Sequence, residues 1–191
     1  MEPIARQAMA TGGDPQALAQ AIADQLVRDD LRIAFVFADH RLPPEPFAAI
    51  QGATRAPVVG CSAAGVLGPG AAAAGAEPCV VGLGLYGDWL RVGVGVAAEL
   101  SAGDPLVRSR DAVRQAAAEL GASEDALDPG RHVAVSLFDG LGSQVEAFCI
   151  GSAAAVPKLR FLGAGSSTVI TADDPGDGRH SHVWARGEAR L

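Results

Sequence analysis

Three short stretches of this sequence combine glycine with small polar side chains, and each follows a run of residues typical of a buried β-strand. They are residues 60–65 (GCSAAG), 139–143 (DGLGS) and 163–167 (GAGSS). Glycine lets backbone approach a ligand closely, while serine hydroxyls, carboxylates and free amides supply hydrogen bonds. These residue types therefore favour the binding of a small polar molecule.

The candidate ligand-binding residues come from all three stretches. If the preceding strands are parallel neighbours joined by crossovers, the stretches meet at the carboxyl edge of one sheet, where open α/β sheets bind ligands. Asp139 would accept a hydrogen bond from a ligand amine or hydroxyl, although a plain tight turn explains the Asp-Gly pair equally well. The candidates are Gly60, Cys61, Ser62, Ala63, Gly65, Asp139, Gly140, Gly163, Gly165, Ser166 and Ser167.

Cys61 raises a different hypothesis, an enzyme with a cysteine nucleophile. A reactive thiolate needs a base or a cation beside it, and none of the histidines has a spacing that places it there. The GCSAAG stretch also lacks the Gly-x-Ser-x-Gly spacing of a hydrolase and the lysine of a phosphate-binding loop. We favour a structural or ligand-lining cysteine and no catalytic residue, with a cysteine-dependent enzyme as an alternative.

The histidines and the acidic residues near the C-terminus raise the question of a metal. The aspartates of residues 173–177 lack the spacing of a calcium-binding EF-hand, and His180 and His182 have no third ligand nearby in the sequence. We therefore predict no metal site and no required cofactor. Haem needs only an apolar pocket and one axial histidine, for which His40 or His182 would serve, so a haem-based gas sensor stays open as an alternative.

The length and the charge narrow the class of protein. A chain of 191 residues suits one domain of ordinary size. The formal net charge of −7 opposes binding to nucleic acid or to an anionic membrane. The 3 cysteines have no paired spacing, and no apolar run is long enough for a signal peptide or a membrane span. We expect a cytoplasmic protein that binds neither nucleic acid nor membrane.

The elements that would position the polar stretches alternate between helix and strand. Asp14 and Pro15 suit the N-cap and the first turn of a helix, and apolar residues recur after them at helical spacing. The expected order is a helix at 14–28, a strand at 31–37, a short helix at 47–51, a strand at 57–60, two strand-like runs at 79–100, a helix at 104–120, a strand at 132–138, a helix at 143–152 and a strand at 158–162.

Two local patterns add detail to this order. The runs within 79–100 flank Gly87-Asp88 and predict a β-hairpin, while Ser143 and Glu146 have the spacing of a capping box. Four glycines leave one face of the hairpin bare, so something must pack closely against it. The fold class that follows is α/β, with a mostly parallel sheet, one antiparallel hairpin and flanking helices. The four glycines are Gly82, Gly84, Gly93 and Gly95.

The order of PVVGCSAAGVL, an apolar hairpin, a long helix, VSLFDGLGSQVEAF and LRFLGAGSS resembles the FIST N domain, a sensory module of signal-transduction proteins in bacteria and other organisms. The resemblance extends from about Ile33 to the end of the chain. It implies a cytoplasmic sensor of a small ligand such as an amino acid, and some relatives are described as haem-binding nitric-oxide sensors. This chain has Gly163-Ala164-Gly165 where the family has Gly-Gly.

The resemblance also bears on the expected domain organisation and binding partners. We expect an N-terminal amphipathic helix in residues 1–30 and a sensory domain in residues 31–191, without the C-terminal companion domain that the family commonly carries. The implied partners are a small-molecule ligand and a signalling protein or companion domain. A protein-interaction module that uses the bare hairpin face stays open as a further alternative.

Overall fold

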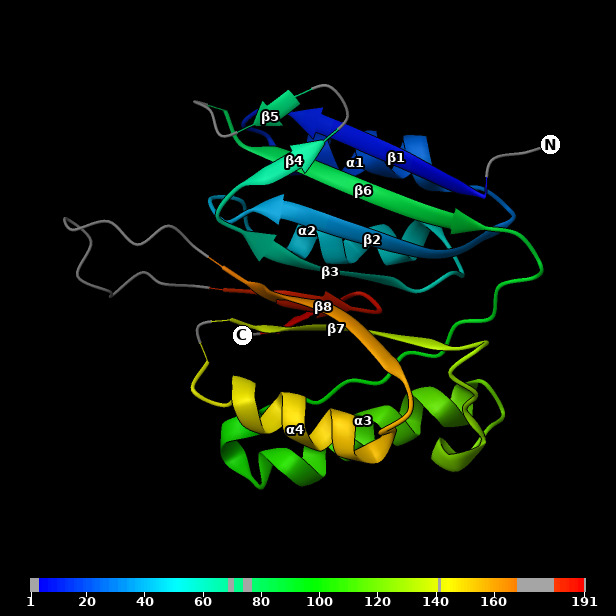
Figure 1. The fold of residues 1–191 in the computed structure, drawn as a ribbon. Helices are drawn as coiled ribbons and strands as arrows, with labels where there is room; N and C mark the ends of the chain where they lie inside the picture. The colour runs from blue at the N-terminus through cyan, green and yellow to red at the C-terminus, as the bar shows by residue number, and fades with distance from the viewer. Residues whose placement is uncertain (1–3, 69–70, 74–76, 141, 168–180, 191) are drawn as a thin grey trace. The chain divides into compact units, whose positions relative to one another are not determined.

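A computed structural model describes residues 4–68, 71–73, 77–140, 142–167 and 181–190 of the chain (Figure 1). The chain divides into two compact units, and each is described by itself. Unit 1 comprises Met1–Leu90 and Gly165–Leu191, and unit 2 comprises Arg91–Ala164. Among the described residues, no helix is both long enough and apolar enough to cross a bilayer.

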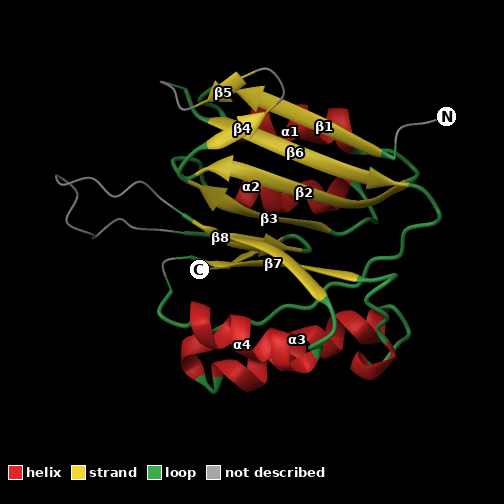
Figure 2. Cartoon of the chain, in the orientation of Figure 1, coloured by secondary structure: helices red, strands yellow, loops and turns green. Residues whose placement is uncertain are grey.

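Unit 1 is built on a sheet with helices on one of its faces (Figure 2). The described strands of this sheet are six, in the order β1-β6-β2-β3-β9-β10. Strands β4 (Val66–Gly68) and β5 (Ala71–Ala73) pair with each other separately. The other elements are β1 (Ala5–Thr11), α1 (Pro15–Leu26), β2 (Leu31–Asp39), α2 (Glu45–Ala48) with a 3-10 turn at Ala49–Ala53, β3 (Val58–Ala63), β6 (Cys79–Tyr86), β9 (Val183–Ala185) and β10 (Glu188–Arg190).

Helix α1 confirms the predicted start and the predicted buried stripe. The Asp14 side chain accepts hydrogen bonds from the backbone N–H groups of Gln16 and Ala17, at 2.9 and 3.4 Å. This satisfies backbone donors that the first helical turn leaves without partners. Leu18, Ile22 and Leu26 are buried on one face of the helix, as the spacing predicted.

The α/β class with flanking helices is confirmed, but the expected parallel majority is wrong for the sheet of unit 1. Strands β2 and β3 are parallel, whereas β6 is antiparallel to both β1 and β2, and β9 is antiparallel to β3. The prediction assumed that the strands before the three polar stretches are parallel neighbours joined by crossovers. Here the described residues between β3 and β6 include the short strands β4 and β5, and β6 runs antiparallel beside β2.

Two parts of this sheet had no clear signal in the sequence. Strand β1 consists mainly of alanines and polar residues, so its alternation is weak. The last two strands form a hairpin whose turn residues, Arg186 and Gly187, both have positive φ, at 54° and 84°. Such turns match the twist of the two strands that they join.

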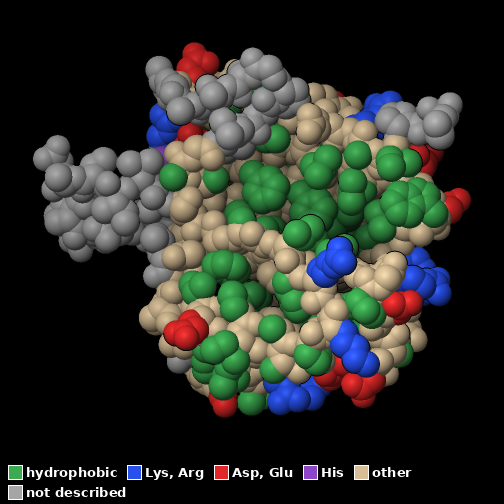
Figure 3. All heavy atoms as spheres, viewed as in Figure 1, with side chains coloured by type: hydrophobic (Ala, Val, Ile, Leu, Met, Phe, Trp, Pro, Cys, Tyr) green, Lys and Arg blue, Asp and Glu red, His purple; other side chains and the backbone are tan. Residues whose placement is uncertain are grey.

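The sheet face opposite α1 carries apolar side chains that are partly exposed (Figure 3). Gly82 faces Ile22 and Leu26 of α1, so the alternate residues of β6 point to the other face. Those residues, Val81, Leu83 and Leu85, are half-buried. Helices therefore cover the apolar sheet of unit 1 on one side.

Unit 2 contains two helices that pack against each other and a small parallel sheet, within the part of the chain that is described. The Asp104 side chain accepts a hydrogen bond from Leu106 N at 2.9 Å, which confirms the predicted cap. The elements are α3 (Pro105–Glu119), β7 (Val133–Asp139), α4 (Val145–Ala155) and β8 (Arg160–Ser166), with 3-10 turns at Leu100–Ala102 and Glu124–Ala126.

The predicted capping box at Ser143 is wrong. Helix α4 begins at Val145, and its N-cap is Gln144, which makes no side-chain capping hydrogen bond. The Ser143 hydroxyl instead accepts a hydrogen bond from the Gln144 side-chain amide at 3.4 Å. The serine is one residue too early because the turn after β7 continues through Gln144.

The predicted hairpin over residues 79–100 is also wrong. Its first run is β6, but residues 91–98 pair with no described strand and belong to unit 2. The expected close packing on the glycines is confirmed and comes from the protein itself. A Cβ atom on Gly84 would meet the Tyr86 ring, and one on Gly93 or Gly95 would overlap backbone of α3.

Candidate functional site

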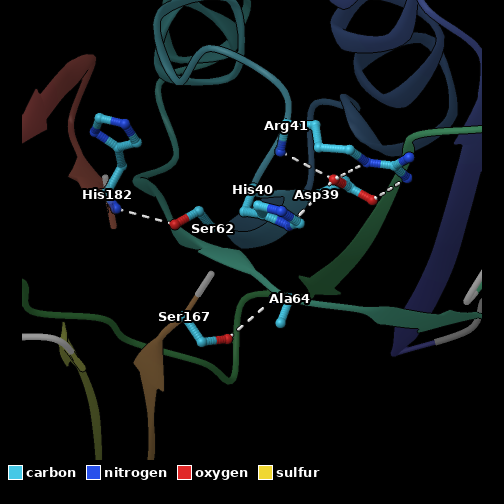
Figure 4. A network of polar contacts seen from close by, with 7 residues as sticks. All are labelled: Asp39, His40, Arg41, Ser62, Ala64, Ser167 and His182. Carbon is cyan, nitrogen blue, oxygen red and sulfur yellow. Dashed lines mark hydrogen bonds and ion pairs between the residues drawn. The ribbon is translucent and has the colours of Figure 1, made fainter. Parts of the chain in front are cut away.

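The carboxyl ends of β2 and β3 carry a group of polar residues that we call the polar cluster (Figure 4). Segments from four places in the sequence of unit 1 contribute to it: the ends of β2, β3 and β8, and the residues before β9. Backbone joins the two parallel strands here, because His40 N donates to the Ala63 carbonyl at 3.0 Å. The cluster consists of Asp39, His40, Arg41, Ser62, Ala64, Ser166, Ser167, Ser181 and His182.

Ser62 holds three of these segments together. Its backbone N–H donates to the His182 carbonyl at 2.9 Å, and its hydroxyl accepts from His182 N at 3.0 Å. Its carbonyl accepts from Ser167 N at 3.1 Å. The residue is only 2% exposed, so these hydrogen bonds replace water that burial has removed.

The serines at the end of β8 join the cluster through their side chains. Ser166 Oγ donates to Ser181 Oγ at 2.8 Å, and both residues are buried. Ser167 Oγ accepts a hydrogen bond from Ala64 N at 3.0 Å. Two of the three polar stretches identified in the sequence, 60–65 and 163–167, therefore meet in space at their serines.

The strands extend further into both stretches than the sequence indicated. β3 does not end at Gly60 but continues to Ala63, because Cys61 pairs with Phe37 of β2 and with Val183 of β9. β8 likewise runs to Ser166, so the GAGSS stretch is mostly strand instead of a turn. Glycine and serine in these positions are strand residues whose partners come from distant parts of the chain.

Asp39 and Arg41 form a charged pair that sequence reasoning missed. Arg41 Nε donates to Asp39 Oδ1 at 2.8 Å, its terminal nitrogen donates to Oδ2 at 2.7 Å, and its backbone N–H donates to Oδ1 at 2.9 Å. Burial disfavours the carboxylate, but these hydrogen bonds and the nearby positive charge outweigh it and lower the pKa of Asp39. The available signal was the triplet Asp39-His40-Arg41 at the end of a largely apolar strand.

His40 completes the charged side of the cluster. Its Nδ1 is buried and lies 3.4 Å from Asp39 Oδ1, without the geometry of a hydrogen bond. Nδ1 makes no hydrogen bond to another described residue. As a haem candidate, His40 lies beside an ion pair instead of in the apolar pocket that haem would need, and His180 lies outside the described residues.

The remaining predicted residues of unit 1 lie within β3 or just after it, and a ligand-binding role for them stays a prediction. Gly60 lies under the buried Trp184 ring, where a Cβ atom would overlap the Val36 carbonyl. Cys61 is 2% exposed, and burial raises the pKa of its thiol to about 11. Ala63 is the last residue of β3, and Gly65 follows at an exposed position with open space around it.

Asp139, Gly140 and Gly163 belong to unit 2. Asp139 ends β7, and its carbonyl accepts a hydrogen bond from Gly142 N at 3.3 Å. A Cβ atom on Gly163 would overlap the Ser136 carbonyl of β7. A ligand-binding role for these three residues stays a prediction.

A metal ion bound by side chains needs several ligating residues close together. No group of three or more His, Cys, Asp or Glu residues among those described is arranged to do so. The acidic residues 173–177 fall outside the described ranges.

Comparison with known proteins identifies one family. The model of the FIST N domain matches residues 8–190, nearly the whole chain. The match includes α1 and part of β1, and so begins earlier than the resemblance from about Ile33. A search of curated proteins gives no significant match.

Proposed function

Because this chain belongs to the FIST N domain family, whose members are sensory domains in signal transduction, we propose that it is a sensor that binds a small polar metabolite at the polar cluster of unit 1. The observation that carries this proposal is the meeting of the Ser62 and Ser167 segments beside the Asp39–Arg41 pair. It lies at the carboxyl ends of parallel strands, a position that α/β proteins commonly use for ligands.

The chemistry of the cluster favours a ligand with both an amino and a carboxylate group. The carboxylate of Asp39 is held in its charged form, and Arg41, 40% exposed, supplies a fixed positive charge beside it. A zwitterionic amino acid would complement these two charges, and the imidazole of His40 adds a further polar contact. Amino acids are therefore the first ligand class to test.

The hydrogen bonds of the cluster also suggest how binding becomes a signal. Ser167 Oγ accepts a hydrogen bond from Ala64 N, and the Ser62 hydroxyl accepts one from His182 N. These side-chain bonds reinforce the backbone bonds that join the Ser167 and His182 segments to β3. A ligand that replaces either bond changes the population of two arrangements of these segments. A signalling protein or a companion domain would respond to that difference.

The proposal requires no reaction. The buried thiol of Cys61, with its raised pKa, is not an activated nucleophile. We further propose a cytoplasmic location, which is supported by three free cysteines, Cys61, Cys79 and Cys149.

Thermal unfolding of the purified chain against the common amino acids, small metabolites and haem tests the proposal. A ligand at a hundredfold its dissociation constant stabilises the native state by about 2.7 kcal/mol, which raises the unfolding temperature measurably. We expect an amino acid to give such a shift, and Ser167→Ala and Asp39→Asn to abolish it.

Matched controls separate loss of the site from loss of the fold. Ser123→Ala changes an exposed serine that makes no capping hydrogen bond, and Asp24→Asn removes the same charge from an exposed helix position. Both controls should keep the shift. A shift that survives in Ser167→Ala and Asp39→Asn would place the ligand elsewhere, and a shift with haem alone would favour the gas-sensor alternative.

A further inference from the structure

Residues 91–98, which follow β6 in Figure 1, lie along helix α3 within unit 2. Three side chains of α3 form hydrogen bonds with the backbone of residues 91–98. Val94 N donates to Glu119 Oε2 at 2.9 Å, Val96 N donates to Gln115 Oε1 at 3.1 Å, and the Arg108 guanidinium donates to the Ala98 carbonyl at 2.8 Å. All three bonds involve even-numbered residues of the segment.

The spacing of these contacts shows that the segment is extended. A Cβ atom on Gly93 would overlap the Ala116 carbonyl, and one on Gly95 would overlap the Ala112 carbonyl. Two residues of the segment thus match four residues of α3. An extended chain covers about 6.6 Å in two residues and a helix about 6 Å in four, so the two lengths agree.

In an extended chain, the backbone groups of alternate residues point to opposite edges. The even edge of residues 91–98 is occupied by Glu119, Gln115 and Arg108. Gly93, Gly95 and Ala97 form the odd edge, are half-buried, and make no backbone hydrogen bond to any described residue. An extended edge with unpaired N–H and C=O groups is a template for another strand.

We propose that the odd edge of residues 91–97 pairs with the same edge of a second copy of this chain, antiparallel and centred on Gly95. Gly95 then faces Gly95 of the other copy, and Gly93 faces Ala97. Each such pair exchanges both of its backbone hydrogen bonds. The pairing is isologous, so every contact occurs twice.

The charges at the ends of the segment favour one direction and one register for this pairing. Arg91 is exposed at one end of the segment, and the exposed Glu99 directly follows the other end, where its positive φ of 50° ends the extended chain. Neither residue has an ion pair with a described residue. Centring the antiparallel pair on Gly95 brings Arg91 of each copy to the end of the other copy's extended segment, next to the Glu99 that follows it. A parallel pair would place Arg91 beside Arg91, and an antiparallel pair centred on Gly93 would leave both charges without partners.

Charge reversal in the full-length chain tests the proposal by sedimentation equilibrium without ligand, so the result is independent of the sensory site. We expect a reversible dimer. Arg91→Glu or Glu99→Arg should raise its dissociation constant about tenfold, because each change creates like-charge contacts at both ends. The double variant Arg91→Glu/Glu99→Arg should restore the original value. The control Arg131→Glu changes the net charge as Arg91→Glu does, at another exposed position, and should leave the dimer intact.

Hydrogen exchange gives a second measurement that a dimer formed through another surface would not reproduce. With rising protein concentration, the amides of Gly93, Gly95 and Ala97 should exchange more slowly, while those of Val94 and Val96 should not change. A chain that stays monomeric, a double variant that does not recover dimerisation, or protection without this alternation would overturn the proposal.

Discussion

Asp39 is a buried carboxylate whose charged form is stabilised mainly by Arg41. It is 2% exposed, and Arg41 supplies two side-chain hydrogen bonds and one backbone hydrogen bond to it. Removing one partner of such a pair leaves an uncompensated buried charge, which is far less favourable than the intact pair. Loss of Arg41 should therefore lower the free energy of unfolding.

Arg41→Met should destabilise the protein at pH 7 by about 2 kcal/mol, since it strands the Asp39 carboxylate. With Arg41 present, the lowered pKa of Asp39 contributes stability above the unfolded value near 4 that is lost as the pH falls through the folded pKa. Without Arg41, burial raises that pKa, so the penalty is present at pH 7 and fades as the pH falls. Urea unfolding at pH 7 and pH 4 measures the difference.

The difference in stability between wild type and Arg41→Met should therefore shrink at pH 4. A difference that is constant or larger at pH 4 would contradict the assigned role of Arg41. Arg32→Met is the control, because Arg32 pairs with the exposed Asp88 and should change stability little at either pH.

The three cysteines differ sharply in exposure, which gives a second prediction at this scale. Cys61 and Cys79 are buried and Cys149 is exposed. Burial raises the pKa of both buried thiols. Iodoacetamide at pH 7.5 should label Cys149 first, and Cys61 and Cys79 only after unfolding, as mass spectrometry of the peptides would show. Rapid labelling of Cys61 in the folded protein would revive the cysteine-enzyme hypothesis.

At the scale of elements, glycines let helices and strands approach closely. On Gly95 a Cβ atom would overlap helix backbone, whereas on Gly82 it would meet the flexible end of Leu26, and on Gly52 it would meet nothing. Backbone cannot move aside as a side-chain end can. Gly95→Ala should therefore destabilise the chain by about 3 kcal/mol, Gly82→Ala by less, and Gly52→Ala hardly at all.

Guanidinium unfolding of the three glycine variants measures this ranking. The Gly52→Ala variant is the control for the general effect of replacing glycine. Equal stabilities for Gly95→Ala and Gly52→Ala would show that residues 91–98 do not lie against α3.

Local signals predicted elements well where a cap or a periodic stripe determines them. Asp14 and Asp104 cap their helices as expected, and β2 and β7 lie where β-branched runs placed them. The failures concern pairing. Cys61 extends β3 because it pairs with Val183, a residue that is distant in the sequence, and no local pattern encodes that partner.

At the scale of the whole molecule, burial and contacts between distant segments decide which parts of the candidate site the sequence could predict. Ser62 and Ser167 were found because glycine and small polar residues mark strand ends, and the structure brings them together. Asp39 and Arg41 were missed because their value depends on burial and on hydrogen-bond geometry, which composition does not reveal. Asp139 lies in unit 2, and its ligand-binding role stays a prediction.

The chain belongs to the FIST N domain family, and the central proposal at this scale is that it binds its ligand at the polar cluster of unit 1. The backbone amides of Ala64 and His182 report on this cluster directly, because each donates to a serine hydroxyl within it. Their NMR signals can be followed while an amino acid that raises the unfolding temperature is added. We predict that both signals move with the same dissociation constant while that of Leu127 in unit 2 stays fixed. Saturable shifts elsewhere, with Ala64 and His182 unchanged, would contradict the account.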